Sequence, residues 1–143
     1  MRFISYLTFV VILSTGGFAM AERLSVSSKI ANIRSGPGTG YEILWKVESY
    51  YPIMVLKKSG LWINFRDFEG DEGWIHTSLV HKKPTVITIK DTCNVRTGPG
   101  TNHDVIFTVG KGIPFLIMDR QKNWIQIKHA DGDRGWIYKS LVW

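Results

Sequence analysis

The chain has 143 residues, of which 44% are hydrophobic and 21% are charged. This composition is ordinary for a globular protein and excludes an intrinsically disordered one, and the length suits one domain of common size or two small ones. The net charge of +6 favours anionic partners. Cys93 is the single cysteine. It excludes an internal disulfide, so packing alone has to stabilise the fold.

The first residues, MRFISYLTFVVILSTGGFAMA, carry one positive charge at Arg2, then an apolar run and the ending AMA. This order of features is typical of a secretory signal peptide at residues 1–21, cleaved after Ala21. The alternative is a retained membrane anchor, because the run from Ile4 to Met20 is almost long enough to span a bilayer. We expect an exported protein, periplasmic or secreted, that does not span the membrane after cleavage.

The rest of the sequence repeats itself after 62 positions, without a gap. NIRSGPGT at residues 32–39 returns as NVRTGPGT at residues 94–101, and GDEGWI at residues 70–75 returns as GDRGWI at residues 132–137. A solenoid repeat is shorter, about 20–50 residues, so this period indicates tandem small domains. We expect a first domain at residues 22–80, a linker at 81–84 and a second domain at 85–143.

Each copy contains short segments with the alternation and composition typical of β-strands. IANIR places Ala31 and Ile33 on one face, and TCNVR does the same with Cys93 and Val95. Cys93 is therefore expected to be a buried small hydrophobic residue. No segment has a sustained helical period. Four strands are predicted in the first copy, at residues 30–34, 51–57, 61–66 and 73–76. The four equivalent strands of the second copy are predicted at residues 92–96, 113–119, 123–128 and 135–138.

With one more strand after the GPG motif, each copy has about five short strands. That is too few for a two-layer sandwich but suits a small curled barrel with few open edges. The predicted fold class is all-β, with two small five-stranded barrels in tandem. Turns that contain glycine, in EGDEGWI and DGDRGWI, join the last two strands of each copy as a hairpin.

The GPG motif predicts a sharp turn, since proline presets φ at the first central position and the following glycine accepts a positive φ at the second. The preceding strand ends at Arg34 or Arg96, and a long excursion of the chain follows. We expect Thr39 and Thr101 to brace this excursion by hydrogen bonds to nearby backbone. Arg34 and Arg96 recur together with Asp71 and Asp133, which indicates either an ion pair or turn capping inside each domain.

The pattern N-[IV]-R-[ST]-G-P-G-T, followed by W-I and then by G-x-x-G-W-I-x-x-S-L-V, resembles the bacterial Src-homology-3-type domain. The resemblance covers about residues 24–80 and again about residues 86–143. It implies a small five-stranded β-barrel with an exported or envelope-associated binding role. Members of that family often adjoin a cell-wall hydrolase domain and target it to peptidoglycan, or to an anionic or peptidic partner. Here the second copy runs to Trp143, so we expect no hydrolase domain after it.

An enzymatic alternative is a cysteine hydrolase that uses Cys93 with His103 or His129. Nothing near the cysteine in sequence lowers the pKa of its thiol, and an inward-facing cysteine is not an exposed nucleophile. The four histidines are scattered without the spacing of a metal site. We therefore expect no catalytic residue, no cofactor and no metal.

The excess of basic residues lies in the linker and the second copy. These residues are either a solvated surface or a surface that attracts anionic polymers. Nucleic acid is not an expected partner of an exported protein. The basic residues concerned are Lys82, Lys83, Lys90, Lys122, Lys128, Arg134 and Lys139.

Tryptophans recur at equivalent positions and either close the ends of a barrel or present a face to a ligand. The resemblance implies a groove between the excursion after GPG and the neighbouring hairpin loop. The candidate ligand-binding residues are Tyr41, Trp62 and Trp74 in the first copy and His103, Trp124 and Trp136 in the second.

The expected function is that of a non-catalytic exported binding protein. Its aromatic-lined grooves recognise a cell-envelope component such as peptidoglycan or its peptides. The alternative is a protein–protein interaction module that recruits an envelope partner protein. The sequence leaves the oligomeric state open.

Overall fold

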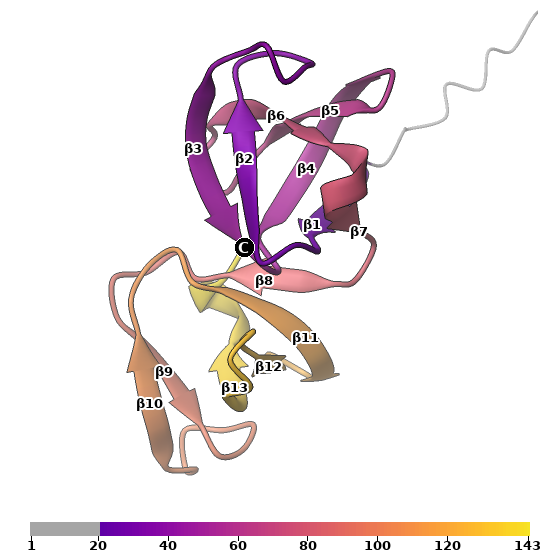
Figure 1. The fold of residues 1–143 in the computed structure, drawn as a ribbon. Helices are drawn as coiled ribbons and strands as arrows, with labels where there is room; N and C mark the ends of the chain where they lie inside the picture. The colour runs from indigo at the N-terminus through magenta and orange to yellow at the C-terminus, as the bar shows by residue number, and fades with distance from the viewer. Residues whose placement is uncertain (1–20) are drawn as a thin grey trace, which may run out of the picture.

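The computed structural model describes residues 21–143 (Figure 1). The predicted signal peptide, apart from Ala21, lies outside the described residues. Within them no helix is long and apolar enough to cross a membrane. The first unit contains β1 (Arg23–Val26), β2 (Ile30–Arg34), β3 (Ile43–Glu48), β4 (Pro52–Ser59), β5 (Trp62–Arg66), β6 (Glu72–His76), the 3-10 turn η1 (Thr77–Leu79) and β7 (Val80–His81). The second unit contains β8 (Thr85–Ile87), β9 (Cys93–Arg96), β10 (Val105–Val109), β11 (Pro114–Gln121), β12 (Trp124–Lys128), β13 (Arg134–Tyr138) and the 3-10 turn η2 (Lys139–Leu141).

The strands form two antiparallel sheets with the same topology. The first has the order β3-β2-β6-β5-β4-β1-β7 and the second the order β10-β9-β13-β12-β11-β8. In place of a strand equivalent to β7, the second unit has the isolated bridge between Thr88 and Val142. The all-β class and the two repeated units are thus confirmed.

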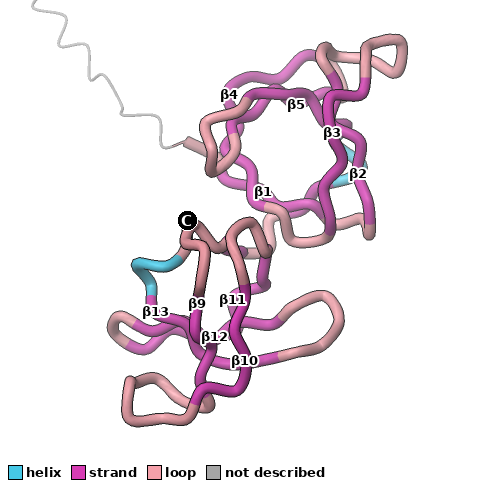
Figure 2. Tube along the Cα trace, turned by 90° about the vertical axis from the view of Figure 1, so that its left-hand side faces the viewer, coloured by secondary structure: helices cyan, strands magenta, loops and turns pink. Residues whose placement is uncertain are grey.

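The number of strands and the closure of the sheets differ from the prediction. The sheets have seven and six strands, because very short strands such as β7, with two residues, show no alternation in the sequence. The first sheet curls around its core like a ring (Figure 2). Its terminal strands β3 and β7 are not paired with each other, so the sheet is open rather than a closed barrel.

Alternation along the central strands builds a separate core in each unit. In β2, Ala31 and Ile33 are buried, and in β9 so are Cys93 and Val95. The prediction that Cys93 is a buried small hydrophobic residue is confirmed. Gly73 lets β6 approach β2, because a Cβ atom there would overlap the side chain of Ile33.

The two cores meet where the units join. Ile87 of β8 belongs to the core cluster of the first unit, and Trp143 packs against the same cluster. The C-terminus accordingly lies between the units in Figure 1. Arg23 of β1 crosses the junction and donates hydrogen bonds to the carbonyl oxygens of Thr85 and Trp143, at 3.3 and 2.7 Å. Apolar packing and these bonds together join the units.

One buried polar pair is present in the first unit alone. The Tyr51 hydroxyl donates a hydrogen bond of 2.7 Å to Oδ2 of Asp67, and both residues are buried. The other carboxylate oxygen of Asp67 accepts the backbone N–H groups of Glu69 and Asp71, at 3.0 Å each, and so orders the hairpin loop. Burial, followed by the hydrogen bond to Asp67, raises the pKa of Tyr51 well above its ordinary value.

Left-handed backbone recurs at equivalent places, but not always with glycine. Gly60 has φ +59° where the second copy has Lys122 at 54°, and Gly112 has φ +83° where the first copy has Tyr50 at 71°. The backbone therefore requires positive φ at both sites in both copies. A residue with a Cβ atom is strained there, by about 1–2 kcal/mol.

We predict that Lys122→Gly stabilises the protein by about 0.5–1 kcal/mol, because the relief of left-handed strain exceeds the added entropy of the unfolded chain. Gly60→Lys, the reciprocal change, should destabilise it. Urea unfolding of both variants measures the free energies. Equal and small effects of the two changes would contradict the argument.

We predict that Tyr51→Phe lowers the free energy of unfolding by about 1–3 kcal/mol at neutral pH, because a buried carboxylate oxygen loses its donor. The raised pKa of Tyr51 makes its contribution complete below pH about 10, the ordinary tyrosine pKa, and progressively lost above it. The difference in stability between the two proteins should therefore shrink as the pH rises above about 10. Denaturation at pH 7, 10 and 11 measures it, and a constant difference would contradict the assignment.

Candidate binding grooves

Each unit has a surface groove at the same place. Both grooves lie over the outer face of the sheet, between the loop after the GPG motif and the start of the strand that bears the first tryptophan. Their volumes are about 500 Å³ in the first unit and about 670 Å³ in the second. The equivalent lining pairs are Asn32 and Asn94, Arg34 and Arg96, Thr39 and Thr101, Trp62 and Trp124, His76 and Tyr138, and Leu79 and Leu141.

An arginine at the end of β2 or β9 fixes the loop that forms one wall. Nη1 of Arg34 donates to the carbonyl oxygens of Thr39 and Tyr41, at 3.0 Å each. Nη1 of Arg96 donates to the equivalent carbonyl oxygens, at 3.3 and 3.0 Å. Of the two expected arginine roles, turn capping is confirmed, and neither arginine forms an ion pair within residues 21–143.

The prediction that Thr39 and Thr101 brace the loop with their hydroxyl groups is wrong. Among the hydrogen bonds of the described residues, these threonines contribute backbone carbonyl oxygens that accept from the arginines. One guanidinium nitrogen carries two hydrogens and can donate to two carbonyl groups at once. A threonine hydroxyl has a single hydrogen to donate.

The GPG turn is also tighter than predicted. The N–H of Gly38 donates to the carbonyl oxygen of Gly36 at 2.9 Å, and Gly100 repeats the bond to Gly98 at 3.0 Å. A bond between residues two apart closes a γ-turn around the proline, whose ring already fixes φ near −65°. Neither Gly38 nor Gly100 has a positive φ, so the expected positive φ is wrong.

The glycine before the proline has a packing role instead. A Cβ atom on Gly36 would overlap the ring of Tyr41, and one on Gly98 would lie 2.6 Å from the ring of His103. The aromatic residues at positions 41 and 103 therefore cover the turn of their own loop.

The groove floor is an aromatic pair. The rings of Trp62 and His76 meet edge to face, with centroids 5.2 Å apart, and Trp124 meets Tyr138 in the same way at 5.4 Å. Each pair is a cross-strand neighbour pair, so the sheet register sets it. Nδ1 of His76 accepts the backbone N–H of Ser78 at 3.2 Å, which orients the ring.

The six predicted site residues are thus divided by the structure. Trp62 and Trp124 line the grooves, whereas Tyr41 and His103 lie on the loop without lining them. Trp74 pairs with Arg34 across the strands, and Nζ of Lys57 lies 5.7 Å from its ring centroid.

Trp136 pairs with Arg96 in the same way and is only 8% exposed. It has little free surface to offer a ligand. Fewer of the candidate aromatic residues line the grooves than the sequence indicated.

Asn32 and Asn94 line the grooves but are not among the ligand-binding residues predicted from the sequence, and the same holds for the two arginines. A signal for them was present, because the letters N and R of the repeated motif lie on alternate positions of one strand. Alternation places Asn32 and Arg34 opposite the buried Ala31 and Ile33, on the outer face. Both asparagines and both arginines face outward into the grooves.

The two grooves differ in charge, in some of their lining residues and in the hollows beside them. Lys46 and Ile30 line the first, whereas Thr92 replaces Ile30 in the second. The other side of Trp124 borders a further hollow of about 590 Å³, which Pro99 also lines. The second tryptophan is therefore accessible from two sides.

The catalytic alternative has little support in this geometry. Cys93 is fully buried, its thiol donates to the carbonyl oxygen of Lys90 at 3.4 Å, and burial raises the thiol pKa. The ring of His103 lies against Gly98, and that of His129 meets Phe115 at 5.6 Å between centroids. Within the described part of the chain no group of His, Cys, Asp and Glu is arranged to hold a metal ion.

Two relatives are named as amidases. YrvJ of Bacillus subtilis strain 168, named as an N-acetylmuramoyl-L-alanine amidase, is 29% identical over 122 residues, which cover 78% of this chain and 23% of that protein. LytH of Staphylococcus epidermidis, named as a cell wall amidase, is 38% identical over 52 residues, which cover 36% of this chain and 18% of the relative. The chain thus spans less than a quarter of the length of either relative.

Solved structures give weaker similarities. NlpC2 from Trichomonas vaginalis aligns with a TM-score of 0.39 and 11% identity, over 88% of this chain and 49% of that one. An NlpC/P60 family protein from Bacillus cereus aligns with a TM-score of 0.37 and 14% identity, over 85% and 55% of the two chains.

The family comparison covers most of the sequence. The bacterial SH3 domain matches residues 27–82 and again residues 90–143, which are the two units seen in the structure. The chain belongs to the bacterial SH3 domain family, with two copies of the domain in tandem.

Proposed function

We propose that the protein is a non-catalytic, exported binding protein that recognises peptidoglycan or its peptides in the cell envelope, periplasmic or secreted. The observation that carries this proposal is the same groove, with the same Asn, Arg, Trp and Leu positions, in both units. Both relatives are named as amidases, and these names support peptidoglycan as the ligand.

The grooves combine the groups that a polar, amide-rich chain requires. Asn32 and Asn94 offer both a donor and an acceptor to a peptide or acetamido group. Nη1 of Arg34 is occupied by the loop, but its Nε and Nη2 are not part of that brace and suit a carboxylate. The tryptophan ring supplies an apolar face to a sugar ring or an aliphatic side chain.

The chemistry of the site supports a binding role without catalysis. The groove contains no paired carboxylates and no accessible thiol among its lining residues. A buried cysteine with a raised pKa is a poor nucleophile. The groove supplies recognition, and we assign no reacting group to it.

Two grooves in one chain allow avidity. The units are joined by shared packing of Ile87 and Trp143, so their mutual position is restricted. When both grooves engage one polymer, the second binding event is intramolecular, and overall affinity exceeds that of one groove by about 10²–10⁴.

We predict that Trp62→Ala and Trp124→Ala each weaken binding of the purified protein to isolated peptidoglycan by about 2 kcal/mol or more, as for central tryptophans of other interfaces. Leu61→Ala is the matched control, because Leu61 is 64% exposed and adjacent to Trp62 but does not line the groove. Co-sedimentation measures affinity and capacity, and near-ultraviolet circular dichroism checks folding.

The binding curve distinguishes binding in which both grooves engage one polymer from binding by independent grooves. With both grooves on one polymer, each single variant loses affinity at unchanged capacity. With independent grooves, a single variant keeps the affinity of the other groove and loses part of the capacity, which would contradict the avidity. Folded variants that bind as well as the unmodified protein would contradict the proposed function itself.

A further inference from the structure

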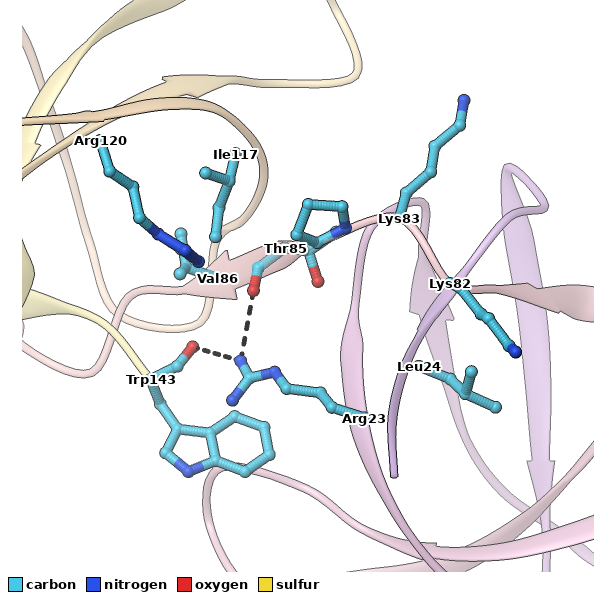
Figure 3. A pocket seen from close by; sticks show the side chains of 10 residues that line it. Arg23, Leu24, Lys82, Lys83, Thr85, Val86, Ile117, Arg120 and Trp143 are labelled. Carbon is cyan, nitrogen blue, oxygen red and sulfur yellow. Dashed lines mark hydrogen bonds between the residues drawn. The ribbon is translucent and has the colours of Figure 1, made fainter. Parts of the chain in front are cut away.

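The junction between the units contains a hollow that is separate from both grooves. It has a volume of about 290 Å³ and shares no lining residue with them. Figure 3 shows side chains from β1, β8, β11 and the connecting segment around it. The lining residues are Arg23, Leu24, Lys82, Lys83, Pro84, Thr85, Val86, Ile117, Arg120 and Trp143.

The charged side chains that line the hollow all have the same sign. They are Arg23, Lys82, Lys83 and Arg120, and none of them forms a salt bridge with an acidic side chain within residues 21–143. The acidic neighbours in sequence do not pair with these four side chains. Glu22 pairs with Lys58 at 3.1 Å, and the carboxylate of Asp119 accepts the backbone N–H of Arg120 at 2.7 Å.

Arg23 is held in place from several directions. Its Nη2 donates to the carbonyl oxygens of Thr85 and Trp143, and its guanidinium carbon lies 4.1 Å from the centroid of the Trp143 ring. Desolvation in this position, followed by the charge of Arg120, lowers the pKa of Arg23. Arginine stays protonated in proteins, so the mutual repulsion of the two guanidinium groups is retained in the fold.

Thr85, which lines the hollow, has an unsatisfied hydroxyl group. The residue is 4% exposed, and its Oγ1 has no hydrogen-bond partner among the described residues. A buried hydroxyl without a partner is uncommon and costs about 1–3 kcal/mol. The hydroxyl is enclosed by protein atoms, so this cost belongs to the packing at the junction.

We propose that this hollow binds a phosphate group, held by the guanidinium groups of Arg23 and Arg120 at the junction of the two units. The flanking Lys82 and Lys83 add long-range attraction. Phosphate is favoured over a carboxylate because a doubly charged tetrahedral ion matches several cations that approach from different elements.

The site has a consequence for the pair of units. Arg23 comes from the first unit and Arg120 from the second, so the bound phosphate contacts both. A ligand that binds only the assembled junction stabilises the folded protein by mass action. It also holds the two peptide-binding grooves in one relative arrangement.

The test is titration of the purified protein with inorganic phosphate at constant ionic strength, followed by calorimetry and by thermal unfolding. We expect saturable binding and a rise in Tm. Arg120→Gln should weaken binding on the order of tenfold, because a hydrogen bond to a charged group contributes about that factor. Lys29→Gln is the control, since it removes one positive charge from an exposed loop outside the hollow.

Equal loss in Arg120→Gln and Lys29→Gln would show that only net charge matters and would overturn the site. So would the absence of saturation, or binding of acetate as tight as that of phosphate. Glycerol 3-phosphate and vesicles containing phosphatidylglycerol distinguish the sources of the group. Binding of either, sensitive to Arg120→Gln, supports the site and identifies a soluble ester or a lipid headgroup as the source.

Discussion

The form of both grooves depends on one guanidinium group in each unit. Arg34 and Arg96 lie at the end of the second strand of the sheet, where the chain leaves it for the GPG loop. By donating to two carbonyl oxygens, each arginine ties this loop to the end of the strand. The groove wall, the position of the aromatic residue on the loop and the approach to the tryptophan all follow from this brace.

The repeat made much of the fold predictable. Alternation in IANIR and TCNVR placed Ala31 and Cys93 in the core, and the hairpin glycines Gly70 and Gly132 do have positive φ, at 83° and 103°. Very short strands could not be found, because two or three residues carry no periodicity. The open sheet could not be predicted either, since closure depends on pairing between strands far apart in the sequence.

The site was predictable in part for a related reason. Recurrence identified the tryptophans and the arginines, but it does not separate a residue kept for packing from one that faces a groove. Trp74 and Trp136 recur as faithfully as Trp62 and Trp124, yet they lie beside the arginines rather than in the lining. Alternation does not distinguish them, because Trp62 and Trp74 lie on the same face of the sheet. The junction hollow could not be predicted, because its residues are brought together by the packing of the two units and form no local motif.

Where the two copies differ in sequence at a shared backbone conformation, the molecule contains its own substitution experiment. At the left-handed sites one copy has glycine and the other has Tyr50 or Lys122, so the same bend of the chain exists with and without a side chain. Likewise the loop that Asp67 orders in one unit is formed in the other with His129 at that position. Each half is therefore an internal reference for the other, and an exchange of residues between the halves keeps to side chains that this backbone already accommodates.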